Sequence, residues 1–498
     1  MRRALVAALA GAILLVASLP VHAANTYGLP ETVRINIGLE GLTQAVISAT
    51  GPFLVTAPEG KTVFRDAGRL AVRTNVLRLD GDIAIPRGYV PVEERPTRLA
   101  LIREARLAEA ISPKSLVRIP FELEQLASVS TLDTGIGPSI FRASSIIGLK
   151  FAPLDQGTLT LNGKGYRGTF EVAPYGQAFT IINTVATDRY LVSVVGSEIP
   201  QDWHREAQAA QVIAARTYLI RHLGSHGSYD LDGDERDQAY KGVYGEADST
   251  EKALQRTAGL VITYAGAPID AFYSANAGGV TENSENVWVT SLPYLRSVAS
   301  PGDEVALRSS WGASSYDWTK EYTEPQLRQQ LFRIGVNVGQ IQAIDVLEKS
   351  ASGGVLLARI RGSLGSRDVI KDSTRFTFGL KSQLFTVQFR PATDQELVKV
   401  DDATRLTELG NLGADRDAVV LSAQSSLQTD GSVLVSGFKT KQYLYRLPAR
   451  VVFTGKGYGH RVGMSQWGMQ GMAVQGADYE QIIKHYYQGV ALTKIAGP

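Results

Sequence analysis

Two segments of the chain carry residue types that could do acid–base or sugar-binding chemistry. The first, residues 190–200, is an apolar run that ends in a single carboxylate, Glu198, followed by Ile199 and Pro200. Apolar surroundings raise the pKa of a carboxyl group, whereas the start of a nearby helix lowers it. Glu198 is therefore either a tuned general acid or an ordinary acid at the first turn of the next helix.

The second segment, residues 455–468, holds five glycines among fourteen residues. Glycine lets the backbone approach a ligand closely. His460, Ser465, Gln466 and Trp467 add hydrogen-bond donors, acceptors and a flat aromatic face that suits a sugar ring. The segment indicates a saccharide-binding loop, and a Gly-rich structural turn is the alternative.

Composition excludes several other chemistries. The chain has no Cys, so it has no thiol nucleophile, thiolate metal site or disulfide. It has 51 Lys and Arg against 49 Asp and Glu, so no nucleic acid partner is expected. Walker, His-Glu-x-x-His and Gly-x-Ser-x-Gly motifs are missing. The acidic run 230–237 opens like a calcium loop, but Glu235 stands where Gly is needed and Lys241 where Glu is needed, which favours a solvated acidic turn.

Residues 1–23 have the pattern of a secretory signal peptide. Arg2 and Arg3 precede an apolar run of 16 residues, 4–19, and small residues end at Ala23. An uncleaved membrane anchor is the alternative, although a bilayer needs about 20 apolar residues. We therefore expect an extracytoplasmic protein, in the periplasm, in the cell wall or secreted, with membrane contact only if the signal is uncleaved.

Alternating and helical patterns indicate the elements that position these segments. Residues 33–37, 158–161 and 180–183 alternate as strands do, and the apolar run up to Glu198 is also strand-like. Residues 203–222 predict a long helix, which Gly224 ends.

Two further helices are predicted, one starting near Thr323 and one over residues 478–488. The mixture of strands and helices predicts an α+β fold. The predicted divisions are a signal peptide at 1–23, a β-rich N-terminal region at 24–112, a connector or small α+β segment at 113–145, and a catalytic module at 146–498 with a polar insertion at 391–447.

Ordered motifs from residue 146 to about 490 resemble the SpoIID/LytB family, which comprises stage II sporulation protein D and the amidase enhancers. The matching stretches are Leu161-Asn162-Gly163, Tyr166-Arg167-Gly168, Tyr190 to Pro200, Glu206 to Tyr218, Tyr240, Tyr244-Gly245-Glu246, Ser274 to Thr281, Val287-Trp288, Pro293-Tyr294-Leu295 and the segment around His460.

The resemblance implies a peptidoglycan lytic transglycosylase that uses the Glu of its Ser-Glu-x-Pro element, here Glu198, as the catalytic acid. One carboxyl suffices, because it protonates the glycosidic oxygen and then deprotonates the C6 hydroxyl of the same muramic acid. If the products were those of hydrolysis, Glu246 and Glu282 would be the first candidates for a second carboxylate. The residues expected to line the glycan cleft are Ser274, Asn276, Thr281, His460, Ser465, Gln466 and Trp467.

The family also includes amidase enhancers, so the competing interpretation is a non-catalytic peptidoglycan binder that activates a separate cell-wall amidase. Glycan strands are the expected partner in both interpretations. The presence of Glu198 favours the enzyme weakly, because a binder could retain it.

The sequence is next compared with the family at the zinc-binding stretch, at Arg461 and at Arg216. Members often bind zinc through cysteines, but here the corresponding stretch offers Asp232 and Asp237. Loss of the metal is favoured over a harder ion held with His226, and we predict neither metal nor cofactor. Arg461 replaces the usual Gly, which would add a bulky charge beside the cleft and alter which glycan fits. Arg216 follows too far along its helix to be a direct partner of Glu198.

Overall fold

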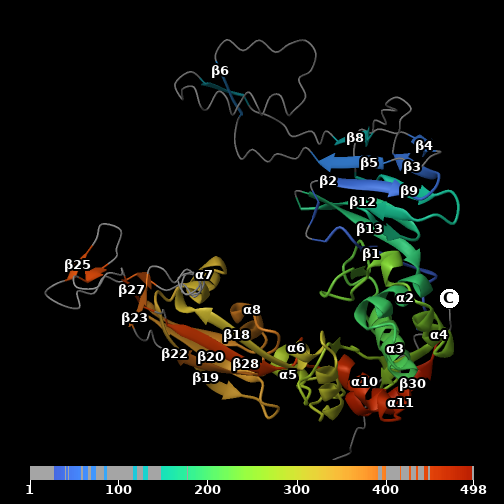
Figure 1. Cartoon of the computed structure of the whole chain (residues 1–498). Helices are drawn as coiled ribbons and strands as arrows, with labels where there is room; N and C mark the ends of the chain where they lie inside the picture. The colour runs from blue at the N-terminus through green and yellow to red at the C-terminus, as the bar shows by residue number, and fades with distance from the viewer. Residues whose placement is uncertain are drawn as a thin grey trace, which may run out of the picture.

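The computed structural model (Figure 1) describes residues 27–57, 147–390 and 449–495, apart from residues 40, 43 and 177, together with short strands between these ranges. The predicted signal peptide lies outside the described residues, and the segments at 113–145 and 391–447 are described only at their strands. Helices and several sheets are both present, which confirms the α+β fold class.

A seven-stranded sheet of order β14-β1-β13-β12-β9-β3-β4 organises the first lobe. Its strands are β1 (Thr32–Asn36), β3 (Phe53–Ala57), β4 (Gly60–Phe64), β9 (Lys150–Pro153), β12 (Thr169–Tyr175), β13 (Ala178–Ala186) and β14 (Leu231–Asp232). Strands β1 and β13 confirm two predicted strands, and they pair antiparallel with Val33 opposite Val185. Both valines are buried, so the N-terminal strands share one core with the region after residue 146.

A five-stranded sheet of order β11-β10-β2-β5-β8 lies beside it. Its strands are β2 (Gln44–Ala49), β5 (Arg69–Thr74), β8 (Ala127–Leu132), β10 (Leu159–Leu161) and β11 (Lys164–Tyr166). Asn162 and Gly163 join β10 to β11 with positive φ angles of 50° and 85°. A two-residue turn of this kind matches the twist of paired strands, which explains the hairpin formed by β10 and β11.

The apolar run before Glu198 is helical, so the prediction of a strand is wrong. Helix α2 (Thr187–Glu198) follows β13 directly and ends at Glu198 itself. Residues 190–195 are all buried, and a run buried on every side has no polar period that would distinguish a helix from a strand. The acid thus closes one helix instead of standing at the start of the next.

Helix α3 (Arg205–His222) confirms the long predicted helix and crosses the centre of the first lobe. Residues 206–220 are all buried, because α2, α4 (Asp248–Arg256), α10 (Gln466–Val474) and α11 (Tyr479–Tyr486) pack around α3 (Figure 1). Asp478 caps α11 with a reciprocal capping box to Gln481, as the sequence predicts for this helix start.

Short elements complete the first lobe and bring distant segments together. They are η2 (Gly242–Gly245), β15 (Leu260–Tyr264), β16 (Ala267–Pro268), β17 (Tyr273–Ser274), α5 (Ser284–Val287), η3 (Pro301–Arg308), α6 (Ala313–Tyr316), β29 (Met464–Ser465) and β30 (Ala491–Lys494). Strand β17 runs parallel to β29, with Tyr273 beside Met464 and Ser274 beside Ser465. This pairing positions the start of α10.

A second lobe has its own core and extends away from the first (Figure 1). It contains β18 (Asp317–Thr323), α7 (Glu324–Arg333), β19 (Ile341–Lys349), β20 (Val355–Gly362), β21 (Gly365–Ile370), α8 (Ser373–Phe378), β22 (Phe385–Arg390) and β28 (Arg450–Lys456). Thr323 starts α7 with a capping box, which confirms the predicted helix start. Trp318, Phe378 and Phe453 are buried in the core of this lobe.

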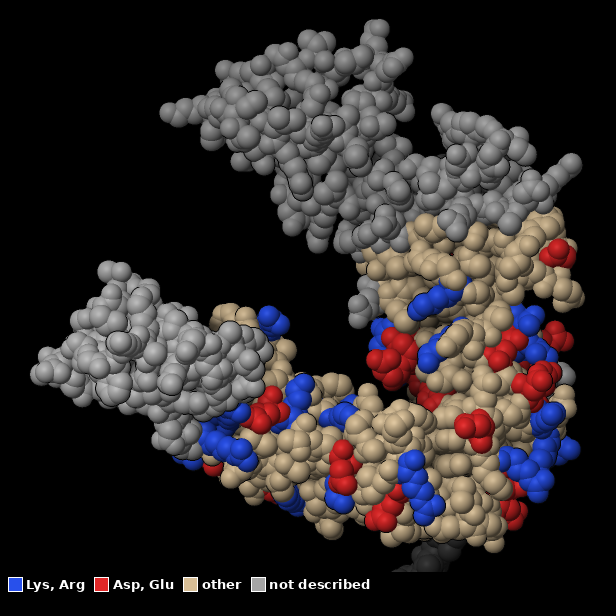
Figure 2. Space-filling model, viewed as in Figure 1, with Lys and Arg blue, Asp and Glu red and all other residues tan. Residues whose placement is uncertain are grey.

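The remaining described strands are β6 (Ile83–Pro86), β7 (Leu116–Ile119), β23 (Gln395–Lys399), β24 (Asp415–Arg416), β25 (Ser425–Leu427), β26 (Val433–Val435) and β27 (Gln442–Arg446). Acidic and basic side chains are interspersed over the described surface that Figure 2 shows. Among the residues that the structure describes, no helix has the length and apolar character needed to cross a bilayer.

Candidate active site

Glu198 is the last residue of α2 and is partly exposed. Its Oε1 accepts a hydrogen bond from the backbone N–H of Ala239 at 2.8 Å, and its Oε2 accepts one from Nε2 of Gln466 at 3.1 Å. Ala239 lies in the loop before η2, and Gln466 is the first residue of α10. Three segments that are far apart in sequence therefore meet at one carboxyl group.

The surroundings of Glu198 favour its protonated form. Burial raises the pKa of Glu198 above its ordinary value, and the hydrogen bonds from Ala239 and Gln466 lower it only in part. The position at the end of α2 acts in the same direction as burial, because the negative end of the helix dipole disfavours a carboxylate. A raised pKa is the property that a general acid needs near neutral pH.

A chain of hydrogen bonds leads from Glu198 into the protein. The Tyr273 hydroxyl donates to the Glu198 carboxylate and accepts from Nε2 of Gln238 at 3.1 Å. Oε1 of Gln238 accepts from the buried Tyr190 hydroxyl at 3.1 Å. Sequence reasoning missed Tyr273, although it directly precedes the predicted Ser274. No local signal marks Tyr273, because its approach to Glu198 depends on the pairing of β17 with the distant strand β29.

Of the predicted cleft residues, Gln466 is the one whose side chain hydrogen-bonds Glu198. Ser274, Asn276, Thr281 and Ser465 are buried, and three of them hold nearby backbone. Asn276 Oδ1 accepts from Gly278 N at 2.8 Å, Thr281 Oγ1 from Val298 N at 2.8 Å, and Ser465 Oγ from Ala277 N at 3.1 Å. These side chains stabilise the loops through hydrogen bonds with backbone N–H groups. Because they are buried, the structure does not favour the predicted contact with glycan.

Trp467 is also largely buried, between Trp203 and Trp311. His460 is partly exposed, and its ring packs against Trp288 with the ring centroids 5.2 Å apart. The Val462 N–H donates to Nδ1 of His460 at 3.0 Å, and burial lowers the pKa of His460 to about 4. His460 is therefore neutral at physiological pH and unsuited to donate a proton as an imidazolium.

The guanidinium of Arg461 is fully buried, which corrects the expectation of a charge beside the cleft. Its Nε donates to the Ala277 carbonyl and its Nη2 to the Val280 carbonyl, both at 2.9 Å. Arg461 has a φ of 65°, a conformation that glycine adopts without strain. This backbone conformation explains why a glycine would suit the position, and the buried contacts explain how an arginine is accommodated.

Glu282 is the buried counter-ion of Arg461, with Oε2 3.8 Å from Nη1. The same oxygen accepts from the hydroxyls of Ser350 (2.6 Å) and Ser352, which lie in the turn between β19 and β20. The ion pair therefore lies where the two lobes meet. Glu246, the other candidate second carboxylate, is held by a bidentate ion pair with Arg167 at 2.7 and 2.9 Å.

Arg216 hydrogen-bonds backbone and does not contact Glu198. Its Nη1 donates to the carbonyls of Thr257 at 2.8 Å and Leu260 at 3.0 Å. Burial lowers the pKa of Arg216 to about 10. The guanidinium thus ties α3 to the segment before β15, in agreement with the predicted distance from Glu198.

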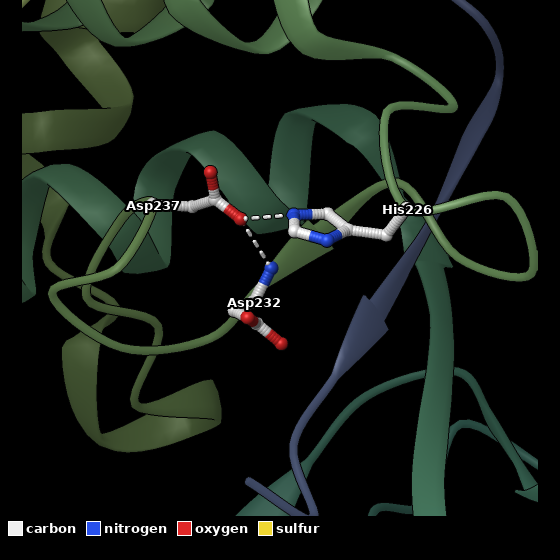
Figure 3. Close-up of side chains that lie close together, drawn as sticks. All are labelled: His226, Asp232 and Asp237. Carbon is white, nitrogen blue, oxygen red and sulfur yellow. Dashed lines mark hydrogen bonds and ion pairs between the residues drawn. The ribbon is translucent and has the colours of Figure 1, made fainter. Parts of the chain in front are cut away.

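A cluster of three possible metal ligands lies in the described part of the chain (Figure 3). The ligand atoms of His226, Asp232 and Asp237 lie within 4.8 Å of one another. Oδ2 of Asp237 hydrogen-bonds His226 Nε2 at 2.8 Å and the Asp232 N–H at 2.7 Å. Oδ1 of Asp237 accepts from the Tyr218 hydroxyl at 2.8 Å, and Oδ1 of Asp232 accepts from Asn36 Nδ2 at 2.8 Å.

This cluster does not fit the zinc that the family resemblance implies. A structural zinc site is closed by four ligands, usually with thiolates, whereas here one imidazole and two carboxylates are present. The carboxylate oxygens are also bonded to protein donors, and Arg236 Nε lies 3.5 Å from Oδ2 of Asp232. Positive charge and N–H and O–H groups thus stand where a metal would have to bind.

We expect chelation to leave the folded protein unchanged. Hydrogen bonds among Tyr218, His226 and Asp237 already satisfy this cluster, so its stability does not depend on a metal. Thermal unfolding before and after dialysis against EDTA should give the same midpoint. Stoichiometric zinc in elemental analysis, together with unfolding on its removal, would contradict this prediction.

Comparisons with known proteins match both lobes. Residues 175–264, which contain Glu198 and Ala239, match the family described as Stage II sporulation protein, SpoIID. Residues 308–401, which cover much of the second lobe, match a domain of unknown function.

Three curated relatives align with about two thirds or more of the chain. An uncharacterized protein of Brachyspira hyodysenteriae is 28% identical over 339 residues, 67% of this chain and 74% of the relative. The amidase enhancer of Bacillus subtilis is 27% identical over 339 residues, 67% of this chain and 45% of the enhancer. Stage II sporulation protein D of Bacillus subtilis is 25% identical over 399 residues, 76% of this chain and 91% of that protein. These matches confirm the resemblance to the SpoIID family that the sequence motifs indicated.

Proposed function

We propose that the protein is an extracytoplasmic lytic transglycosylase that cleaves peptidoglycan between N-acetylmuramic acid and N-acetylglucosamine. The observation that carries this proposal is Glu198, a partly exposed residue whose carboxyl pKa is raised by burial and whose carboxyl oxygens are fixed by Ala239 and Gln466. The similarity to the SpoIID family supports a role at the cell wall.

The proposed reaction needs one carboxyl group. Glu198 donates its proton to the glycosidic oxygen, the bond from that oxygen to C1 of muramic acid breaks, and N-acetylglucosamine leaves with a free hydroxyl. The Glu198 carboxylate then takes the proton of the C6 hydroxyl while the C6 oxygen bonds to C1. The product is 1,6-anhydromuramic acid, and the acid is regenerated.

The hydrogen bonds around Glu198 suit both steps. The Ala239 N–H and the Gln466 amide stabilise the carboxylate between the two steps and hold it in one orientation. The Tyr273 hydroxyl adds a third donor. Glu246 and Glu282 are engaged in their own ion pairs, which is compatible with a reaction that uses no second carboxylate.

Mass spectrometry of the products tests this reaction. Purified protein and glycan strands should yield fragments that end in 1,6-anhydromuramic acid, 18 mass units lighter than hydrolysis products because no water is added. Reducing ends in their place would show a hydrolase and would contradict the proposal.

The name of one relative, amidase enhancer, favours a second candidate function. In that case the protein would bind peptidoglycan and stimulate a separate cell-wall amidase without cleaving glycan itself. Two assays separate these functions: one measures glycan cleavage by the protein alone, and the other measures the activity of a purified amidase with the protein added. A protein that does not cleave glycan but accelerates the amidase would support the enhancer function.

We expect the Gln466→Ala variant to shift the pH dependence of cleavage upward. Loss of the amide removes a hydrogen bond that lowers the Glu198 pKa, so the acid keeps its proton to higher pH. The alkaline limb of the kcat/KM profile should move to higher pH, and the maximum rate should fall, because the carboxylate loses a donor. A profile that falls in rate without moving would show that Gln466 does not tune Glu198.

A further inference from the structure

Two large aromatic side chains are exposed on elements that contact the segments holding the Glu198 carboxyl: Tyr244 on η2, and Trp311 between η3 and α6. The exposed fraction is 60% for Trp311 and 86% for Tyr244. Leaving an aromatic ring in water forgoes the free energy of burying its apolar surface. Side chains of this size on a rigid frame beside a polar site are suited to bind a ligand that has both apolar and polar faces.

Trp311 is connected to the site through a row of three indoles. Its ring centroid lies 4.9 Å from that of Trp467, which in turn lies 4.8 Å from that of Trp203. Trp467 directly follows Gln466, the donor to Oε2 of Glu198, and Trp203 comes five residues after Glu198. The two buried indoles therefore connect the exposed one to the start of α10, which carries Gln466.

Tyr244 is carried by η2, which is locked to the last turns of α2. The Ser193 hydroxyl donates to the Gly242 carbonyl at 2.6 Å. The backbones approach so closely that a Cβ on Gly196 would lie 2.1 Å from the Gly245 carbonyl oxygen. A Cβ on Gly245 would lie 2.3 Å from Oγ of Ser197, the residue before Glu198. The backbone that presents Tyr244 is thus immobilised beside the acid.

Each of the two aromatic residues is connected to a different hydrogen-bond donor of the Glu198 carboxyl group. Ala239, which bonds Oε1, leads into η2 and Tyr244, whereas Gln466, which bonds Oε2, leads into the indole row and Trp311. We propose that Tyr244 and Trp311 are sugar-binding platforms that flank Glu198, each packing against the apolar face of a pyranose ring. The glycan strand then passes over the carboxyl with the bond to be cut between the two platforms.

This inference takes its substrate class from the proposed function, and the test separates the two. The inactive Glu198→Gln protein is sedimented with insoluble glycan strands stripped of stem peptides, and the apparent Kd is measured. Adding Trp311→Ala or Tyr244→Ala should weaken binding about tenfold each, as expected for the loss of one ring contact. Trp311→Phe should restore most of the affinity, since it keeps an aromatic face.

Phe332→Ala supplies the matched control, because Phe332 is 66% exposed on α7 of the second lobe. It should leave the apparent Kd unchanged. Thermal unfolding should be similar in all variants, since the removed rings are mostly exposed. Unchanged glycan affinity in folded Trp311→Ala and Tyr244→Ala proteins would overturn the platforms even if the wild type cleaves glycan. Weakened binding with a wild type that does not cleave would support the platforms and refute the proposed reaction.

Discussion

The Glu198→Gln variant should lose glycan cleavage by about 10⁴-fold or more while remaining folded and bound to glycan. Gln has nearly the shape of Glu but no acidic proton, and one group serves both proton transfers here, so both steps fail. Its amide oxygen can still accept the hydrogen bond from Ala239. Release of soluble anhydromuramic fragments, followed by mass spectrometry, measures the loss.

Glu480→Gln is the matched control, because Glu480 lies exposed in the first turn of α11 and pairs only with Lys484 in the described structure. It should cleave glycan at the wild-type rate. Cleavage by Glu198→Gln at more than about a tenth of the wild-type rate would remove Glu198 as the general acid, given the usual size of this contribution.

The Arg461→Gly variant should lower the free energy of unfolding by about 1–4 kcal/mol. Removing one partner of a buried ion pair lowers the free energy of unfolding by about 3–5 kcal/mol. Glycine adopts the left-handed backbone conformation without strain, which raises the free energy of unfolding by about 1–2 kcal/mol. The guanidinium also donates to the carbonyls of Ala277 and Val280, which lose these partners. Urea unfolding, followed by tryptophan fluorescence, measures the difference.

A second variant isolates the ion pair. Adding Glu282→Gln to Arg461→Gly removes the unpaired charge while keeping the hydrogen bonds from Ser350 and Ser352, so part of the stability should return. If Arg461→Gly changed the free energy of unfolding by less than about 1 kcal/mol, the pair would contribute little to joining the lobes.

The sequence was sufficient to single out Glu198, the proposed acid, and to predict several elements around it. Glu198 was found from its motif, and Gln466 from a Gly-rich segment whose residue types suit ligand binding. Helix α3 was predicted because its Ala-rich sequence strongly favours a helix. Helix α11 was predicted because Asp478 is a good N-cap residue. These signals are local, so they can be seen in one stretch of chain.

The remaining features depend on contacts between distant segments. Helix α2 is buried all round, which removes the periodicity that identifies a helix, and Tyr273 meets Glu198 only because β17 pairs with β29. An arginine at position 461 suggests an exposed side chain when only the sequence is known. Its burial depends on contacts with Glu282 and with the second lobe. Packing of this kind has no signature in any single stretch of sequence.

The hydrogen bond between Gln466 and Glu198 joins residues 268 positions apart, and β1 pairs with a strand about 150 positions later. Contacts of such high contact order form slowly, because the entropy of closing long loops is lost before the contacts stabilise the chain. A growing chain that has reached residue 264 already carries Glu198 but lacks the donor to its Oε2. Completion of the site is thereby a late event in folding, coupled to synthesis of both lobes.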